Sequence, residues 1–384
     1  MNSLKNSGFV FWKPSIVSEL PNNTLLPIRG FVFLYFLLST LGLVILSSAS
    51  QAFSTGNSLF LKQLFWFFLS FIALVVTSYI PLDWIRRYTS IAYLLGIVLL
   101  FLVLIPEIGS KINGSRRWIG LGGFNMQPSE GMKFFIVLFL SHYLSIHQRR
   151  LKRFKDGYLM PFLWLGIPCG LIILEPDFGT ALLFGIVGVT LFFLAGMKLR
   201  YLLPTVLLGL IIFSTAIFHN PERLSRVTSF WNPEKYKEDQ SYQLWQGMLA
   251  FGVGGVNGVG LGNGRQQTGF LPEAQTDFVF SVLGEELGFI ATIGVVLVFF
   301  GFGFLGIRSL HHCHQLYHFL LVSGACLFIL YQALINIGVV TGCLPTKGIS
   351  LPFISYGGSS LIVMGVLVGL IINVLKTEQR KRIR

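Results

Sequence analysis

The chain has 384 residues, of which 53% are hydrophobic and only 12% are charged, and its mean hydropathy is +0.70. Soluble domains carry roughly 25% charged residues, so this composition excludes a soluble globular protein and indicates an integral membrane protein with many spans. The formal net charge of +13 is therefore interpreted as a signal of membrane topology, and no nucleic-acid partner is expected.

Apolar stretches of about 20 residues are long enough to cross a bilayer, and the sequence contains ten stretches of roughly this kind. We therefore expect an all-α integral membrane protein with about ten transmembrane helices. The expected spans cover residues 30–50, 58–80, 88–105, 129–146, 158–174, 180–197, 201–218, 278–307, 317–341 and 354–375. A polar N-terminal tail over residues 1–29 precedes this membrane domain of residues 30–375, and a basic C-terminal tail over residues 376–384 follows it.

The distribution of lysine and arginine predicts the orientation. Ten spans put both termini on one side, and that side carries 18 of the 29 Lys and Arg residues, against nine on the opposite side. Positive residues are enriched in cytoplasmic loops, so both tails are predicted to be cytoplasmic. The large loop over residues 219–277, between the seventh and eighth spans, is then extracytoplasmic. The nine basic residues on the outer side indicate an anionic ligand.

The first polar segment on the outer side covers residues 113–119 and reads Asn-Gly-Ser-Arg-Arg-Trp-Ile. The guanidinium groups of Arg116 and Arg117 can fork onto phosphate oxygens, which favours substrate binding. An interfacial anchor made of these arginines and Trp118 is an equally good interpretation, because tryptophan is enriched at the membrane–water interface.

Two further polar segments begin expected spans. Glu130 and Lys133 are three residues apart at the start of the fourth span and can form an ion pair on a helix. A structural salt bridge would explain both residues, but charges are costly at the end of a span, which favours a functional role. A turn and a helix N-cap explain Asp177 and Thr180 before the sixth span, and they leave Glu175 unexplained.

Asp277 follows the long outer loop and directly precedes the eighth span. An ionised carboxylate at this boundary costs free energy unless it has partners or a function, so Asp277 is the leading catalytic candidate. We also expect Thr276 or Asp277 to act as the N-cap of the helix that follows, as the structural role of this segment. The cap does not explain the other carboxylates expected at the same helix start, which are Glu273, Glu285 and Glu286.

Two more segments complete the outer side. Seven glycines between residues 252 and 264 indicate tight turns or re-entrant backbone, and predict a mobile loop ahead of Asp277. Residues 344–360 contribute the cation Lys347, the hydroxyl of Ser355 and small residues that permit close helix packing. A basic, polar pocket beside lipid fits a substrate with a diphosphate head group. A carboxylate in such a pocket can act as a general base toward a sugar hydroxyl.

These segments are similar to those of the SEDS (shape, elongation, division and sporulation) family over roughly residues 30–376. The resemblance rests on residues 113–119 together with Gln-Pro-Ser-Glu (127–130), Pro-Asp-Phe-Gly-Thr (176–180), Gly-Leu-Gly-Asn (260–263), Leu-Pro-Glu-Ala-Gln-Thr-Asp-Phe (271–278), Gly-Glu-Glu-Leu-Gly (284–288) and Leu-Pro-Phe-Ile-Ser-Tyr-Gly-Gly-Ser-Ser (351–360). Pro-Glu-Ala at 272–274, Gly-Glu-Glu at 284–286 and Leu-Pro-Thr-Lys-Gly at 344–348 resemble the division members more than the elongation members.

The resemblance implies a peptidoglycan glycosyltransferase that polymerises lipid II during septal wall synthesis, in the bacterial inner membrane at the division site. Its implied partners are lipid II, a class B penicillin-binding protein (an FtsI-like transpeptidase), other divisome membrane proteins and membrane lipid. Three alternatives remain at this point: a lipid II flippase, an elongation polymerase, and a scaffold that recruits division proteins.

The resemblance also implies roles for individual residues. The essential acid of the family falls on Asp277, and the Trp, Glu and Lys of its earlier motifs fall on Trp118, Glu130 and Lys133. Gln275 stands where histidine is usual, which puts an acid–base role at that position in doubt. We expect Asp277, Glu130 and Lys133 to be catalytic, and Trp118, Arg116, Arg117, Glu273, Lys347 and Ser355 to bind the substrate. No cofactor is firmly implied; a divalent cation, Mg²⁺ or Mn²⁺, is a candidate without an assigned metal site.

Overall fold

The computed structural model describes residues 25–52, 58–112, 115–121, 124–151, 155–266 and 269–383. Residues 1–24 of the predicted N-terminal tail lie outside the described residues, as do Asn113 and Gly114 of the first polar segment. Within the described ranges, ten helices coincide with the expected spans. They are α1 (Leu25–Ala52), α2 (Ser58–Tyr79), α3 (Leu82–Leu104), α4 (Pro128–Ile146), α5 (Met160–Leu174), α6 (Phe178–Leu194), α7 (Leu199–Phe218), α10 (Val279–Leu310), α11 (Leu316–Val340) and α12 (Gly358–Ile383).

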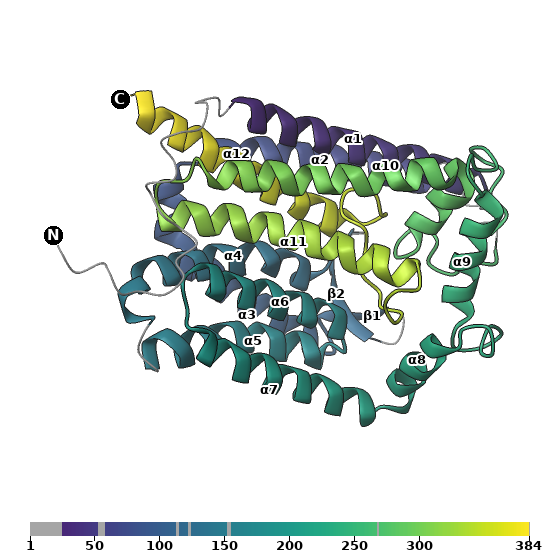
Figure 1. Ribbon diagram of the computed structural model, residues 1–384, viewed down its shortest axis with the longest axis horizontal. Helices are drawn as coiled ribbons and strands as arrows, with labels where there is room; N and C mark the ends of the chain where they lie inside the picture. The colour runs from purple at the N-terminus through teal and green to yellow at the C-terminus, as the bar shows by residue number, and fades with distance from the viewer. Residues whose placement is uncertain are drawn as a thin grey trace.

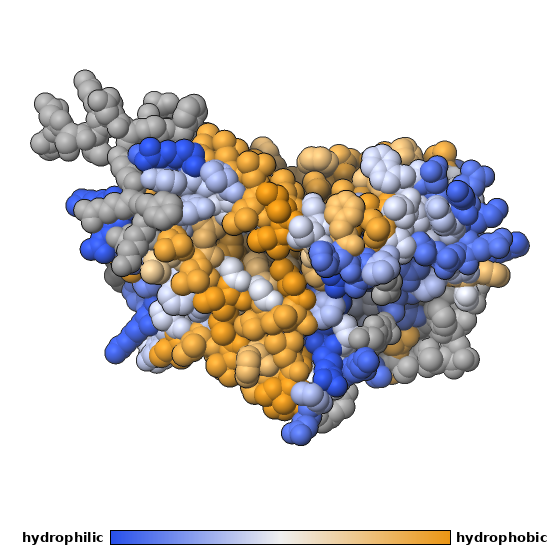
Figure 2. Space-filling view, turned by 90° about the horizontal axis from the view of Figure 1, so that it is seen from below, coloured by the Kyte–Doolittle hydropathy of each residue, from blue (hydrophilic) through white to orange (hydrophobic). Residues whose placement is uncertain are grey.

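The helices form a bundle with an apolar exterior. Eight candidate spans in the described residues are long and apolar enough to cross a membrane, and α6 is a shorter apolar helix. Figure 2 shows a broad hydrophobic region between two hydrophilic ends. In α7, only 6% of the most apolar window is buried inside the protein, so its leucine-rich surface needs a lipid environment. The chain is therefore a multi-pass membrane protein.

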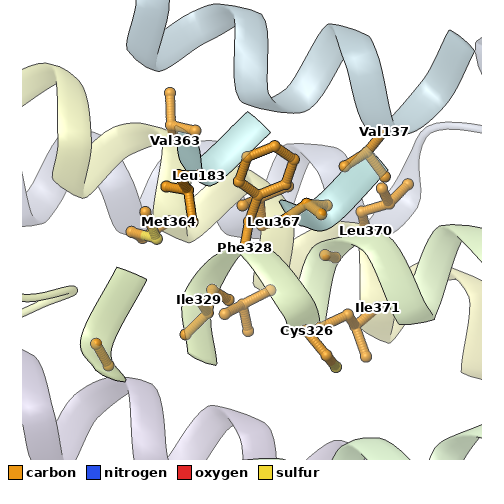
Figure 3. Close-up of a cluster of buried hydrophobic side chains, with 14 of the residues drawn as sticks. Val137, Leu183, Cys326, Phe328, Ile329, Val363, Met364, Leu367, Leu370 and Ile371 are labelled. Atoms are coloured by element: carbon orange, nitrogen blue, oxygen red, sulfur yellow. The ribbon is translucent and has the colours of Figure 1, made fainter. Parts of the chain in front are cut away.

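Helices α11 and α12 form the centre of the bundle, and 72% of the most apolar window of each is buried. Figure 3 shows part of the buried apolar cluster, to which Phe328 of α11, Met364 and Leu367 of α12, Val137 of α4 and Leu183 of α6 contribute. Lipid tails are as apolar as leucine, so close van der Waals packing, more than removal from water, stabilises such a core in a membrane.

A row of glycines brings α12 against α2. A Cβ atom on Gly365 would lie 2.5 Å from the carbonyl oxygen of Ser70, and one on Gly369 would lie 2.5 Å from that of Leu74. The missing side chains let the two backbones approach closely, as small residues commonly do between membrane helices. The contact fixes the position of the turn that joins α2 to α3.

The segment between α3 and α4 corrects the expectation of an entirely α-helical chain. It forms a three-stranded antiparallel sheet in the order β1 (Gly109–Ile112), β2 (Ser115–Leu121), β3 (Phe124–Met126). Strand pairing satisfies the backbone N–H and C=O groups of this segment where no helix continues. Ser110 pairs with Trp118 and Lys111 with Arg116, so Arg117 is an extra residue without a partner in β1. A bulge of this kind redirects a side chain.

The outer loop over residues 219–277 contains two helices, α8 (Pro221–Trp231) and α9 (Tyr242–Gly254). Figure 1 shows α8, α9 and the strands at the end of the bundle opposite the C-terminal end of α12.

The glycine-rich stretch after α9 binds a break in α10. The break lies at Gly288, whose φ and ψ are 74° and −172°. Four backbone hydrogen bonds join the two segments: Val259 N to Glu285 O, Gly260 N to Glu286 O, Phe289 N to Gly255 O and Ile290 N to Val256 O. A Cβ atom on Gly258 would lie 2.2 Å from Glu286 O, so only glycine permits this approach.

The predicted tight turns are confirmed by the positive φ of Gly255, Gly258, Gly260 and Gly262. The four backbone hydrogen bonds to α10 contradict the predicted mobility of this loop.

Replacing Gly365 by alanine should destabilise the protein, because the new methyl group forces α2 and α12 apart. We expect a cost of about 1–3 kcal/mol and a lower midpoint of thermal unfolding in detergent. Gly301→Ala in α10 is the matched control, since a Cβ atom there meets nothing within 4 Å. Equal unfolding midpoints for the two variants would contradict the proposed contact.

Candidate functional site

Asp277 lies two residues before α10, and its carboxylate is not used as a helix cap. Phe278 is the N-cap residue of α10, and no side chain caps it. The Thr276 hydroxyl donates instead to Glu273 Oε2 at 2.6 Å. The predicted cap by Thr276 or Asp277 is therefore wrong. No hydrogen bond from the described residues reaches the side-chain oxygens of Asp277.

The surroundings of Asp277 shift its ionisation toward neutral pH. Burial raises the pKa of Asp277 to about 7; the negative charges of Glu273 and Asp177 act in the same direction, and Arg117 opposes them. A Cβ atom on Gly348 would lie 2.8 Å from Asp277 Oδ2, so the absence of a side chain there leaves room for the carboxylate. A carboxylate with a pKa close to the working pH is suited to accept a proton as a general base.

Two polar side chains hold the backbone around Asp277. Asn336 of α11 donates from Nδ2 to the carbonyl oxygens of Asp277 and Ile349, both at 2.7 Å. Ser355 donates to Thr276 O at 2.5 Å and accepts a backbone N–H of its own turn at 2.7 Å. Ser355, predicted to bind substrate, is buried and uses its hydroxyl to fix the segment that carries Asp277.

Glu130 and Lys133 form the predicted ion pair, with 2.6 Å between Nζ and Oε1 and both side chains buried. Lys133 Nζ also donates to Gln332 Oε1 at 2.7 Å, and Gln332 Nε2 donates to Ser350 O at 2.9 Å. Gln332 and Asn336 are one turn apart on α11, so the same helix connects the ion pair to Asp277. Neither amide was predicted as a site residue, although two polar residues four apart in an apolar span were a usable signal.

The bulged Arg117 binds the turn between α5 and α6. Its Nε donates to Glu175 O at 3.1 Å and its Nη2 to Pro176 O at 2.8 Å, and Nη1 lies 3.7 Å from Asp177 Oδ2. Asp177 caps α6, as predicted, by accepting the N–H and the hydroxyl of Thr180 at 3.1 and 2.9 Å. The guanidinium fork of Arg117 is thus already engaged by the protein.

Glu175, which the turn and cap left unexplained, is fully buried. Neither of its carboxylate oxygens has a hydrogen-bond partner among the described residues. Burial raises the pKa of Glu175 to about 8, with Asp177 acting in the same direction and Arg117 opposing. Glu175 is therefore protonated at neutral pH and adds no negative charge to the site.

The other predicted binding residues are accessible. Arg116 and Trp118 are half-buried in β2, and Glu273 is exposed. Glu273 has a φ of 55°, a left-handed conformation that is uncommon for residues other than glycine. Such backbone strain concentrates at functional sites, and Glu273 shares its turn with Asp277.

Positive side chains gather around the first residues of α6. We call Arg117, Arg223, Arg226 and Lys347 the outer cation cluster. Arg223 Cζ lies 3.7 Å from the centroid of the Phe178 ring, and Lys347 Nζ lies 5.5 Å from the same centroid. Burial lowers the pKa of Lys347 to about 8; Arg226, Arg223 and Arg117 act in the same direction, and Asp177 opposes them. Arg223 and Arg226 of α8 were not predicted as site residues. Positive side chains that repel one another at close range form a favourable binding site for a multiply charged anion.

Glu285 and Glu286 lie in the first turns of α10, as expected, and their side chains are engaged by the glycine-rich loop. Glu285 Oε1 accepts two consecutive backbone N–H groups, beginning with Arg265, at 2.7 and 3.1 Å. Glu286 Oε1 accepts the N–H of Gly262 at 3.0 Å and the hydroxyl of Ser48. Both side chains are fully buried, and the loop donors offset the cost of burying them. Their role is to fix the loop.

The described side chains of the candidate site do not form a complete set of ligands for a bound metal ion. In the described part of the chain, no three His, Cys, Asp or Glu side chains are grouped to hold a metal ion. Mg²⁺ is often bound by one or two carboxylates together with substrate phosphates. A divalent cation here would therefore need ligands from the substrate.

Residues 29–380 match the family described as "Cell cycle protein", labelled FtsW, RodA and SpoVE. A Coxiella burnetii protein named "Probable peptidoglycan glycosyltransferase FtsW" is 42% identical over 346 residues, which cover 88% of this chain and 93% of the relative. Stage V sporulation protein E of Bacillus subtilis is 38% identical over 349 residues, which cover 89% of this chain and 95% of the relative.

Two solved structures have a similar fold. One chain belongs to a peptidoglycan synthase complex that coordinates polymerization and crosslinking; it has a TM-score of 0.76 and 28% identity, with 91% of this chain and 98% of that chain covered. The rod shape determining protein RodA of Thermus thermophilus has a TM-score of 0.67 and 28% identity, with 91% and 96% covered. The chain belongs to the FtsW/RodA/SpoVE family of cell cycle proteins, the SEDS family that its motifs resemble.

Proposed function

We propose that the chain is a peptidoglycan glycosyltransferase that polymerises lipid II for the septal wall, in the inner membrane at the division site. The names of its relatives support the activity. The observation that carries the proposal is Asp277, whose carboxylate accepts no hydrogen bond from the described residues and has a pKa of about 7. Arg117, a member of the outer cation cluster, is close enough to lower this pKa.

The proposed topology places this site outside. All ten helices that match the expected spans would cross the membrane, both termini would be cytoplasmic, and the loop over residues 219–277 would face the outer compartment. The excess of Lys and Arg on the side of the termini supports this orientation.

In the proposed reaction, Asp277 takes the proton of the C4 hydroxyl of an acceptor N-acetylglucosamine. The oxygen attacks the anomeric carbon of a donor N-acetylmuramic acid, and the bond from that carbon to the diphosphate oxygen breaks. Undecaprenyl diphosphate leaves with the electron pair, and single displacement converts the α-linked donor to a β-1,4 product. The outer cation cluster stabilises the negative charge that develops on the diphosphate.

The roles proposed for the other predicted residues follow from their contacts. Glu130 and Lys133 orient the outer end of the bundle through Gln332, and Arg117 fixes the α5–α6 turn. Arg116, Trp118 and Glu273 are proposed to contact the substrate, because their side chains are accessible.

A divalent cation, Mg²⁺ or Mn²⁺, could arrive with the diphosphate and would add positive charge beside the cluster. No step is assigned to it, because the described residues do not form a three-ligand site.

A class B penicillin-binding protein is the proposed partner, with other divisome membrane proteins. The support is the similar fold of a chain from a peptidoglycan synthase complex that couples polymerization to crosslinking. The partner would cross-link the strands that this chain makes.

Asp277→Asn should lower the rate of glycan polymerisation by about 10²–10⁴-fold, because the amide keeps the size of the side chain and cannot act as a base. The measurement is polymer formation from labelled lipid II by the purified chain, alone and with a class B penicillin-binding protein that lacks its transpeptidase serine. Asp239→Asn, an exposed acid of the same outer loop, is the matched control.

Near-normal polymerisation by Asp277→Asn would refute the catalytic assignment. Movement of lipid II across vesicles without polymer, by the wild-type chain, would indicate a flippase. Neither activity, even with the partner present, would indicate a scaffold.

The polymerisation rate should depend on pH through two groups. The Asp277 base must be ionised, so the rate rises as pH increases through about 7. Lys347 must be protonated to stabilise the diphosphate, so the rate falls as pH increases through about 8. Lys347→Arg should remove the alkaline decline, because a guanidinium group stays charged. An unchanged alkaline decline in Lys347→Arg would show that another group causes it.

Glu130→Gln and Lys133→Met should each be strongly destabilising, because each leaves a buried charge without its partner; the expected cost is about 3–5 kcal/mol. The double variant should lose less than the sum of the two, in both the unfolding midpoint and the polymerisation rate. Strictly additive losses would show that the two residues act independently.

A further inference from the structure

A polar pocket lies at the end of the bundle opposite Asp277. It is a cavity of about 100 Å³ between the turn that joins α2 to α3 and the last turns of α12. Its walls are residues 78–81 and, from α12, Asn373, Lys376, Thr377 and Arg380. The outer site uses none of these residues.

Buried hydrogen bonds hold the walls of this pocket. Asn373 Nδ2 donates to Thr77 O at 2.7 Å and to Ile80 O at 2.6 Å, and Asn373 is only 4% exposed. Thr77 O lies in the last turn of α2 and Ile80 O follows the helix, so Asn373 satisfies two carbonyl groups at the end of α2 and fixes the turn to α12. These bonds hold the walls of the pocket in place.

The pocket carries two positive charges and the hydroxyl groups of Ser78, Tyr79 and Thr377. Lys376 and Arg380 are four residues apart on one face of α12. Lys376 Nζ lies 3.8 Å from the centroid of the Tyr79 ring and donates to Ser78 Oγ at 3.3 Å. Neither cation forms an ion pair with an acidic side chain among the described residues. Glu378, which lies between them in sequence, is buried and engaged by His318 of α11.

The mouth of the pocket lies at the border between the apolar surface and the polar end. Tyr79, which lines it, is 68% exposed, and Trp84 at the start of α3 is 63% exposed. Exposed Tyr and Trp are typical of the membrane–water interface. Above them, the outward surfaces of α2 and α3 are apolar, with Val76 52% exposed and Ile91 64% exposed. An amphipathic ligand bound here would place its polar head group beside the cations and its hydrocarbon chain against the apolar side chains.

We propose that this pocket binds the phosphate head group of an anionic phospholipid in the cytoplasmic leaflet. Arg380 and Lys376 would donate to the phosphate oxygens, with Ser78 and Thr377 as hydroxyl donors. Basic pockets between transmembrane helices on the cytoplasmic side bind anionic head groups in this way. The assignment of the leaflet rests on the proposed topology, whereas the pocket itself does not depend on the proposed enzyme activity.

The test compares lipid binding by full-length variants purified in detergent. Native mass spectrometry would measure the affinity for phosphatidylglycerol, with phosphatidylcholine and soluble glycerol phosphate as separate arms. Lys376→Gln/Arg380→Gln should bind phosphatidylglycerol roughly 30-fold more weakly than the wild-type chain. The control is Lys198→Gln/Arg308→Gln, which removes the same charge from the same end of the bundle and should bind like the wild-type chain.

Two further variants keep the outcome interpretable. Arg380→Gln alone changes only an exposed side chain, cannot disturb the packing of α12, and should weaken binding roughly fivefold. Asp277→Asn should bind phosphatidylglycerol normally, so a failure of the proposed enzyme activity would leave this result unaffected. Equal loss in the control pair, equal binding of phosphatidylcholine, or equal binding of glycerol phosphate would each overturn the proposal.

Discussion

Two amide side chains on α11 hold the outer end of this membrane protein together. A bilayer offers no water to a buried charge, so Lys133, which is 1% exposed, needs oxygen atoms from the protein. Glu130 supplies one and Gln332 the other. The amide group of Gln332 then binds Ser350 O, and one turn later Asn336 does the same for Asp277 O and Ile349 O. The hydrogen bonds that the buried ion pair requires therefore connect α4 to α11. Through Gln332 and Asn336, α11 is in turn bonded to residues 349–350 and to Asp277.

The same arrangement sets the charge balance of the site. Glu175 is uncharged at neutral pH because burial raises its pKa to about 8. Asp177 lies beside Arg117 and accepts the N–H of Thr180 at the start of α6. For Asp277, burial and two neighbouring carboxylates favour the protonated form, and Arg117 favours the ionised form. Binding a diphosphate would neutralise part of the outer cation cluster. Less positive charge near Asp277 favours the protonated carboxyl, so binding of a diphosphate would raise the pH at which Asp277 becomes ionised.

Interactions between residues three or four apart on one helix were predictable from the sequence. Contacts between residues that are distant in the sequence were not. The Glu130–Lys133 pair and the cap formed by Asp177 depend on spacings of three residues within one helix, which a sequence displays directly. The ten apolar stretches likewise follow from composition. By contrast, Glu285 and Glu286 were grouped with Asp277 because they are close in sequence, whereas their hydrogen-bond partners are loop N–H groups about 20 residues earlier.

The strands were missed for a related reason. Each strand is only three to seven residues long, and only the pairing between the strands defines them. The bulge at Arg117 exists only in that pairing. Arg223 and Arg226 were counted as charges of a loop, because their approach to Phe178 and Lys347 depends on how α8 folds back toward α6.

Asp277 is thus held from two directions by different parts of the chain. On one side, α11 and the turn at Ser355 bind the backbone of residues 276 and 277. On the other side, the glycine-rich loop is bonded to the break in α10, both through backbone groups around Gly288 and through the carboxylates of Glu285 and Glu286. Only residues 267–272 separate the bonded part of that loop from the turn of Asp277. A protein that contacts α9 would therefore act on the first turns of α10 and, through them, on the position of Asp277, the proposed base. Stimulation by a partner would then need no catalytic group from that partner, because the partner would change only the fraction of molecules in which Asp277 faces the proposed substrate.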